Sequence, residues 1–287
     1  RRGEVPAALR HNARAAAALA TGEIRRYEFH AAAVRLFEAT AAWVWRDARE
    51  TLRIVDARAA AFDKVPPEER MAYADYLTNL YLSLGRLDQA EDAAALIPSM
   101  NSRNLWRAMV LVERGDLDGL RQHMLGDYRE LTGRIDPQRV RFLIRAGLLE
   151  EAESDLAASY SNSFPAPGPR AELLLARGQP HEAIALLQQV GTSGGQTLAR
   201  AWEAIGNPAK AIEILETGLP TRSEAAAERG SGRPTGRGWI ARRAELLRLY
   251  RLSGRDARAI ESELGALLAV ADRDHPILEL LRNGREW

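Results

Sequence analysis

The chain has 287 residues, of which 46% are hydrophobic and 28% are charged, and its net charge at pH 7 is +1. This composition is typical of a folded protein, and so small a net charge provides no field that would favour nucleic acid or an anionic membrane. The absence of cysteine excludes disulfides, a thiol nucleophile and cysteine-based metal sites. Alanine accounts for 50 residues and aromatic residues for only 6%, so we expect an all-α protein.

Residues 1–65 are expected to form an N-terminal helical region of divergent or truncated repeats. Within it, residues 22–62 have the amphipathic pattern of long helices, with a break expected near residues 39–42. The chain starts without methionine and Gly3 falls in a turn, so we expect it to begin partway through a repeat of a longer protein. The Pro-Pro-Glu-Glu stretch at 66–69 indicates the start of the next helix.

Residues 66–220 are expected to form repeats, because one pattern recurs there: an apolar helix, a glycine turn, and a second helix with a small residue five positions after the glycine. Successive turn glycines are 30, 32, 31, 28 and 48 residues apart, and intervals near 30 are typical of an α-solenoid. Glycine can end the first helix in the left-handed conformation, and alanine lets the second helix approach closely. The glycines are Gly85, Gly115, Gly147, Gly178, Gly206 and Gly254, and the alanines are Ala90, Ala152, Ala183, Ala211 and Ala259.

Three of these units share two further positions, an aromatic residue four before the glycine and leucine eight before it. The aromatic residues are Tyr81, Trp202 and Tyr250, and the leucines are Leu77, Leu198 and Leu246. With these residues the chain resembles the tetratricopeptide repeat family from about residue 70 to its end. The resemblance implies a TPR-like α-solenoid, a right-handed superhelix of antiparallel helix pairs whose first helices line a concave groove. The other units carry leucine and arginine at these two positions, and we expect them to pack irregularly.

The regular spacing is interrupted at residues 221–238, where glycine, serine, proline and arginine are frequent. We expect a flexible insert there, with a mobile loop at 230–238. A shorter turn-rich connector is expected at 159–170. Residues 239–287 then form a C-terminal repeat and a capping helix.

No motif in the chain indicates catalysis. Residues 191–195 match the G-x-S-x-G pattern of hydrolases, but that motif follows a strand, and the residues before it have a helical pattern. His181 and Glu182 fall on the first turn of a second helix, where they are expected to face solvent or cap the helix. The five histidines lack the spacing of metal ligands, and no phosphate-binding loop is present. We therefore expect a protein that is not an enzyme and has no cofactor or metal.

The resemblance places residues three, six and ten before each turn glycine on the groove, where arginine is common and where Glu172 and Glu203 also fall. Because 38 of the 40 basic residues are arginine, which binds carboxylates bidentately, we predict a groove for an acidic or polar segment. Two alternatives stay open: that the arginines are solvated surface residues, and that Trp106 is buried between repeats. The candidate partner-binding residues are Asn79, Trp106, Met109, Arg134, Arg141, Arg145, Arg200 and Arg248.

These observations predict a protein–protein interaction module that belongs to a larger bacterial signalling or regulatory protein. Its partner is expected to be a protein or peptide, without nucleic acid or membrane insertion. The expected compartment is the cytoplasm, with the periplasm left open. The alternative is a sensory domain that binds a small molecule or carbohydrate in the groove.

Overall fold

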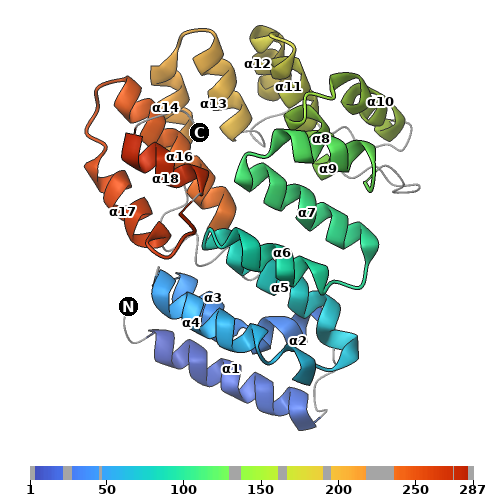
Figure 1. Ribbon diagram of the computed structural model, residues 1–287. Helices are drawn as coiled ribbons and strands as arrows, with labels where there is room; N and C mark the ends of the chain where they lie inside the picture. The colour runs from blue at the N-terminus through green and yellow to red at the C-terminus, as the bar shows by residue number, and fades with distance from the viewer. Residues whose placement is uncertain are drawn as a thin grey trace.

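A computed structural model describes residues 4–21, 28–44, 47–128, 137–160, 167–189, 195–217, 236–273 and 275–283. Within these ranges every regular element is helical, so the predicted all-α class is confirmed. The helices are α1 Glu4–Thr21, α2 Glu28–Arg35, α3 Phe37–Val44, α4 Ala48–Ala59, α5 Arg70–Ser83, α6 Leu87–Ala95, α7 Met100–Arg114, α8 Leu117–Leu125, α9 Pro137–Arg145, α10 Leu149–Tyr160, α11 Pro167–Ala176, α12 Pro180–Gln189, α13 Gly195–Ala204, α14 Pro208–Thr217, α16 Gly236–Leu252, α17 Arg258–Leu268 and α18 Pro276–Asn283 (Figure 1).

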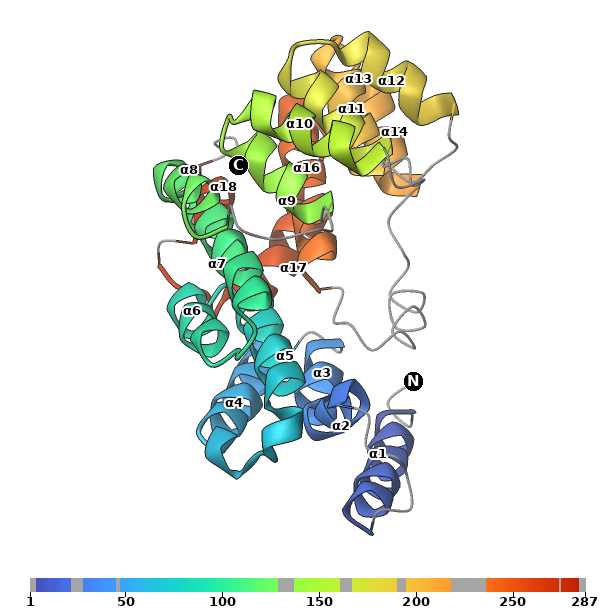
Figure 2. The same ribbon diagram turned by 90° about the vertical axis from the view of Figure 1, so that its right-hand side faces the viewer.

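The N-terminal helices form one end of the molecule, where α1 packs on α2 and α3 (Figure 2). The helical region breaks at the buried Leu36, between α2 and α3, so the break predicted at residues 39–42 was misplaced. The helix start predicted at 66–69 is confirmed, since a 3-10 turn at Pro67–Glu69 leads directly into α5. Glu69 is buried and accepts a hydrogen bond from Arg35 Nε at 2.6 Å, which ties α2 to this turn.

The predicted glycine turns are confirmed at all six positions. Each of these glycines has a positive φ, between 67° and 81°. In each turn the residue after the glycine donates a backbone hydrogen bond to the carbonyl five residues earlier, as Arg86 does to Tyr81 at 2.9 Å. This 6→1 bond of a left-handed helix end satisfies a carbonyl that the helix itself leaves free.

The small residues that follow the turns are confirmed in four of the five units. Ala90, Ala152, Ala183 and Ala211 are all 0% exposed. The prediction was wrong for Ala259, which is exposed. The reason is that α17 begins four residues after Gly254, whereas the other second helices begin two residues after their glycines.

The first helices of successive pairs contact one another. The first helices α5, α7, α9, α11 and α13 each contact the next in the series, whereas the second helices between them make extensive contacts only with the helices before and after them in the chain. We call the face formed by these first helices the inner face.

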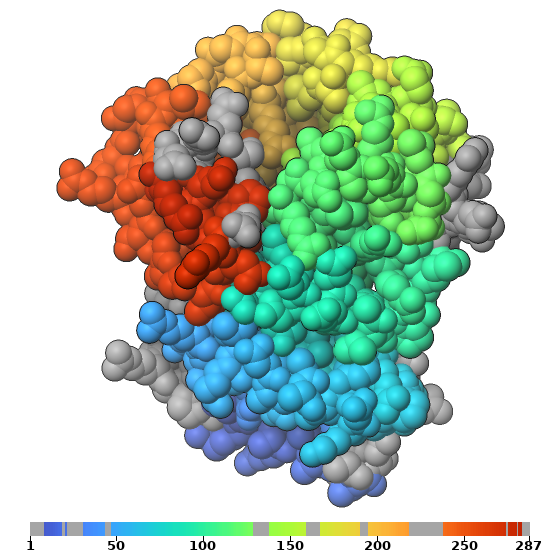
Figure 3. All heavy atoms as spheres, in the orientation of Figure 1, coloured from blue at the N-terminus to red at the C-terminus, as the bar shows by residue number. Residues whose placement is uncertain are grey.

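The two ends of this array also contact each other, which the sequence did not predict. Helix α16 packs against α5, and α17 packs against α4. Leu84, at the end of α5, belongs to the same buried apolar cluster as Ile240 and Ile277. In the space-filling view the C-terminal helices (red) meet the segments near residues 50 and 85 (blue and teal) without a gap (Figure 3). The helix pairs thus form a closed circuit of contacts.

Several predicted segments fall wholly or partly outside the described residues. These are the first part of the predicted insert, 221–235, and residues 161–166 of the connector. The end of the predicted loop, residues 236–238, is helical and forms the first turn of α16. No helix within the described ranges combines the length and apolarity needed to cross a bilayer.

The buried alanines supply a direct test of the helix-pair packing. We expect Ala183→Leu to lower the free energy of unfolding by about 1–3 kcal/mol, because the added atoms push α12 away from α11. Ala185→Leu, at an exposed position of the same helix, is the matched control and should leave stability unchanged. Urea unfolding followed by circular dichroism measures both; equal losses would show that Ala183 is not a packing constraint.

Candidate functional site

The inner face of the first helices carries a chain of charged side chains between neighbouring repeats. Arg141 on α9 donates from Nε to Glu172 Oε1 on α11 at 3.0 Å. Thr197 on α13 donates its hydroxyl to the same oxygen at 3.3 Å. One glutamate therefore links three successive first helices.

Two further glutamates connect α13 to α16. Glu245 is 5% exposed, and it accepts from Arg200 Nε at 2.8 Å and from Gln196 Nε2 at 2.7 Å, so both of its oxygens are satisfied. Arg248 binds Glu203 through two parallel hydrogen bonds, one from Nη1 at 2.6 Å and one from Nη2. These pairs cross the place where the repeat spacing is widest, and their bonds compensate for the desolvation of the buried charges.

Arg145, at the end of α9, has a different environment. Its side chain is exposed, and partial desolvation lowers the pKa of its guanidinium below the ordinary value. The positive charge of Arg200 lowers that pKa further, while Glu172, Glu113 and Glu245 act in the opposite direction. These four charges belong to α13, α11, α7 and α16, so Arg145 lies among the inner helices. Its guanidinium has no hydrogen bond or ion pair within the described ranges.

Two neighbouring arginines keep part of their hydrogen-bonding capacity. Arg141 and Arg200 bind their glutamates only through Nε, and within the described part of the chain their Nη groups make no hydrogen bond. Their side chains are 40% and 38% exposed. Together with Arg145 they present unused N–H donors from α9 and α13.

The other candidate residues lie closer to α5 and α7. Trp106 is 5% exposed and donates from Nε1 to Asp75 Oδ1 at 2.6 Å. Of the two expectations for Trp106, burial between repeats is therefore the one observed. Met109 is half-buried and packs against two apolar clusters. Asn79 accepts a hydrogen bond from Ser83 at 3.4 Å. Arg134 lies outside the described residues.

The structure thus joins Arg141, Arg145 and Arg200 into one group and assigns Arg248 to an ion pair. Sequence reasoning missed Glu245 as the partner of Arg200. A signal was present, since Glu245 lies three residues before Arg248 on α16 and therefore shares a face with it. The arginines of the inner face are accompanied by almost as many glutamates, which makes the face mixed in charge.

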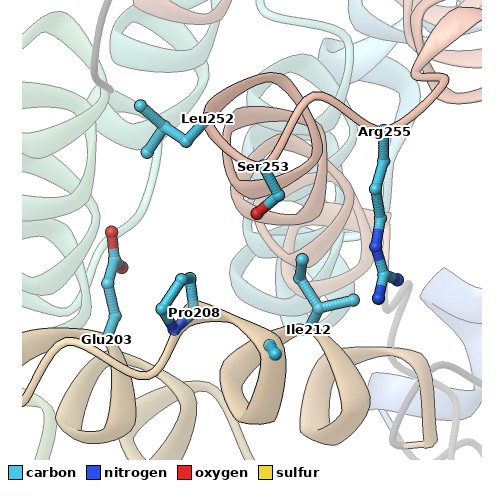
Figure 4. A pocket seen from close by; sticks show the side chains of 7 residues that line it. Glu203, Pro208, Ile212, Leu252, Ser253 and Arg255 are labelled. Carbon is cyan, nitrogen blue, oxygen red and sulfur yellow. The ribbon is translucent and has the colours of Figure 1, made fainter.

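A cavity of about 470 Å³ lies at the edge of the array, between the Gly206 and Gly254 turns. It forms where α17 begins late, and Leu252 beside it is 65% exposed. Figure 4 shows its lining residues from α13, α14 and the end of α16. They are Glu203, Pro208, Ala209, Ile212, Leu252, Ser253 and Arg255.

The residues that the structure describes do not form a metal site. No cluster there of three or more histidine, aspartate or glutamate side chains could hold a metal ion. Residues 191–194 of the G-x-S-x-G match lie outside the described residues, between the end of α12 at Gln189 and the start of α13 at Gly195. A nucleophile elbow needs a strand before the serine, so this context does not fit one. His181 is exposed on the first turn of α12.

Comparisons with known proteins found no match to this chain among family models, curated proteins or solved structures.

The pairing of Glu245 predicts a measurable contribution to stability. Glu245→Ala should cost about 1.5–3 kcal/mol, because it removes two hydrogen bonds to a buried carboxylate and leaves Arg200 unpaired. Partial solvation of Arg200 keeps the loss below that of a fully buried ion pair. Glu50→Ala, which removes the exposed pair with Arg53, should leave the urea midpoint unchanged. Equal midpoints for the two variants would contradict this account.

Proposed function

We propose that the chain is a non-catalytic interaction module that binds a protein or peptide segment through the inner face of its first helices. Its pairs are tetratricopeptide-like repeats wound in a right-handed superhelix, bent so far that its ends meet. The six left-handed glycine turns, the buried alanines and the spacing near 30 residues support this reading. The module serves a larger bacterial signalling or regulatory protein, in the cytoplasm or periplasm.

The observation that carries the proposal is the unpaired Arg145. Arg145 is exposed at the end of α9, near the like charge of Arg200, and makes no hydrogen bond or ion pair within the described ranges. A carboxylate that enters this place gains charge-assisted hydrogen bonds from Arg145 and from the unused Nη groups of Arg141 and Arg200. The bound segment therefore brings an acidic side chain or a free C-terminal carboxylate.

The glutamates of the inner face restrict which segments bind. Glu172 and Glu245 hold Arg141 and Arg200 in place, so the donors are oriented before the partner arrives. The same glutamates repel anionic groups at neighbouring positions, which favours a segment with one or two well-placed carboxylates over a polyanion such as nucleic acid.

A second candidate function, a sensory domain for a small molecule, is favoured by the cavity beside Leu252. Its volume of about 470 Å³ falls in the range of roughly 300–1,000 Å³ of small-molecule sites. Apolar walls from Pro208 and Ile212 lie between Glu203 and Arg255 (Figure 4). A ligand of this cavity should raise the melting temperature of the protein without depending on Arg145.

The proposal is tested with labelled Gly-Ser peptides that carry glutamates, and with lysine peptides as the reference. We expect the acidic peptides to bind, and Arg145→Glu to weaken their binding at least about tenfold in fluorescence polarisation, because it reverses the central charge. Arg121→Glu is the matched control, since Arg121 is exposed on the second helix α8.

Two results would contradict the proposed site. One is equal loss of binding in Arg145→Glu and Arg121→Glu, which would show that the loss comes from the change in net charge and not from the site. The other is an absence of acidic-peptide binding to the unmodified protein, which would leave the small-molecule alternative in the lead.

A further inference from the structure

The cavity beside Leu252 has apolar walls on two sides. Pro208 and Ala209, on the first turn of α14, form one wall, and both are exposed. Leu252, the last residue of α16, lies on the other wall and is 65% exposed, more than any other large hydrophobic side chain in the described part of the chain. The side chain of Ile212 points into the space between them (Figure 4). An apolar group placed there would remove both walls from water, which favours its binding.

The turn that follows Leu252 differs in sequence from the other five. In those units the second residue after the turn glycine is leucine or proline, and it starts the second helix; the residues are Leu87, Leu117, Leu149, Pro180 and Pro208. After Gly254 this position is Asp256, whose side chain is 72% exposed, and α17 begins only at Arg258. The cavity coincides with this change of sequence.

A positive charge lies at one side of the cavity. Arg255 Cζ is 5.6 Å from the centre of the Tyr250 ring, and Arg255 Nη1 is 3.6 Å from Glu216 Oε1. The hydroxyl of Tyr250 donates to the same glutamate oxygen, so the three side chains form one group. The separation of 3.6 Å exceeds that of a hydrogen bond, and the Arg255 side chain is 48% exposed. Arg255 is therefore oriented and keeps N–H donors for a second anion.

Two further polar groups line the cavity from opposite walls. The Ser253 hydroxyl points into the space between the walls (Figure 4), and within the described ranges it makes no hydrogen bond. Glu203 lies on the side away from Arg255, and Arg248 binds both of its oxygens. The charge of Glu203 is thus compensated, yet each carboxylate oxygen can accept a second hydrogen bond. The cavity therefore has donors on one side, apolar walls in the middle and an acceptor on the far side.

We propose that this cavity binds a small aromatic acid that carries a hydroxyl group opposite its carboxylate; this inference rests on the second candidate function above. The carboxylate accepts hydrogen bonds from Arg255 and Ser253, and the ring lies between Pro208 and Leu252. The hydroxyl at the far end of the ring donates to Glu203. Such an acid has the same order of groups as the cavity, and a flat ring fits between two facing apolar walls.

The same arrangement disfavours other classes of small molecule. An amine in place of the carboxylate would meet the like charge of Arg255. A dicarboxylate would place its second negative charge beside Glu203. These two repulsions give the site its specificity for a single carboxylate.

The probe for this site is para-hydroxyphenylacetate, with tyramine and acetate as references. Tyramine keeps the ring and the hydroxyl but carries an ammonium group instead of the carboxylate, and acetate keeps only the carboxylate. Isothermal titration calorimetry on the full chain measures the affinity of each compound, and the melting temperature provides a second readout. We expect the hydroxyphenylacetate to bind and to raise the melting temperature, and both references to do neither.

Two pairs of variants locate the binding. Arg255→Gln should weaken the affinity for the hydroxyphenylacetate by about tenfold, because it removes charge-assisted hydrogen bonds. Arg258→Gln is its matched control, since that side chain is 90% exposed on α17 and does not line the cavity. Leu252→Ala should weaken the affinity by about threefold, whereas Leu117→Ala, at an exposed leucine of α8, should not. All four side chains are exposed or half-exposed, so the urea midpoint should stay constant.

Absence of hydroxyphenylacetate binding, or equal affinity in Arg255→Gln and Arg258→Gln, would overturn this ligand class. Loss of binding in Arg145→Glu would also overturn it, because the acid would then bind on the inner face. If tyramine raises the melting temperature instead and Leu252→Ala removes that effect, the ligand class is wrong, while the second candidate function stands. Binding of acidic peptides through Arg145 is tested separately and does not depend on any of these outcomes.

Discussion

The contact between the Gly85 turn and Asp272 determines the shape of the molecule, because it joins segments that the order of repeats would otherwise leave at opposite ends. One aspartate accepts the first N–H of α6, pairs with Arg86 and donates its own N–H to Gly85. Around it, Leu84 joins the apolar cluster of the C-terminal helices. The directional bonds fix the register of the join, and the apolar burial supplies most of its free energy.

The chemistry of the inner face combines charges from several helices. Charges on α7, α11, α13 and α16 all act on Arg145, and desolvation lowers the pKa of its guanidinium. The pairs Arg200–Glu245 and Arg248–Glu203 hold α13 to α16 across the widest interval between repeats. The helices that hold the array together therefore also carry the charges of the inner face.

The local features of the fold could be predicted from the sequence because each is decided within a few residues. A glycine after an apolar helix becomes a left-handed turn whatever the rest of the chain does, and an alanine five residues later is buried wherever the second helix begins two residues after the turn. Ala259 shows the limit of this rule: a delay of two residues in the start of α17 turned it outward. The break at Leu36 was predicted at residues 39–42 for a related reason. Apolar residues on both sides of Leu36 leave the helical period undecided there.

The closure and the candidate site needed the three-dimensional structure. Nothing in the sequence marks Asp272 as the cap of a helix 185 residues away, because long-range capping leaves no periodic signal. The arginines of the inner face could be listed from their spacing, but which of them are paired depends on the glutamates that the curvature brings near.

The most direct test of this account is small-angle X-ray scattering of the unmodified chain in dilute solution. The closed circuit predicts a single compact species, with a pair-distance distribution that has no extended tail and does not change with protein concentration. A distribution with a long tail, fitted only by an extended array in which α16 is far from α5, would contradict the closure.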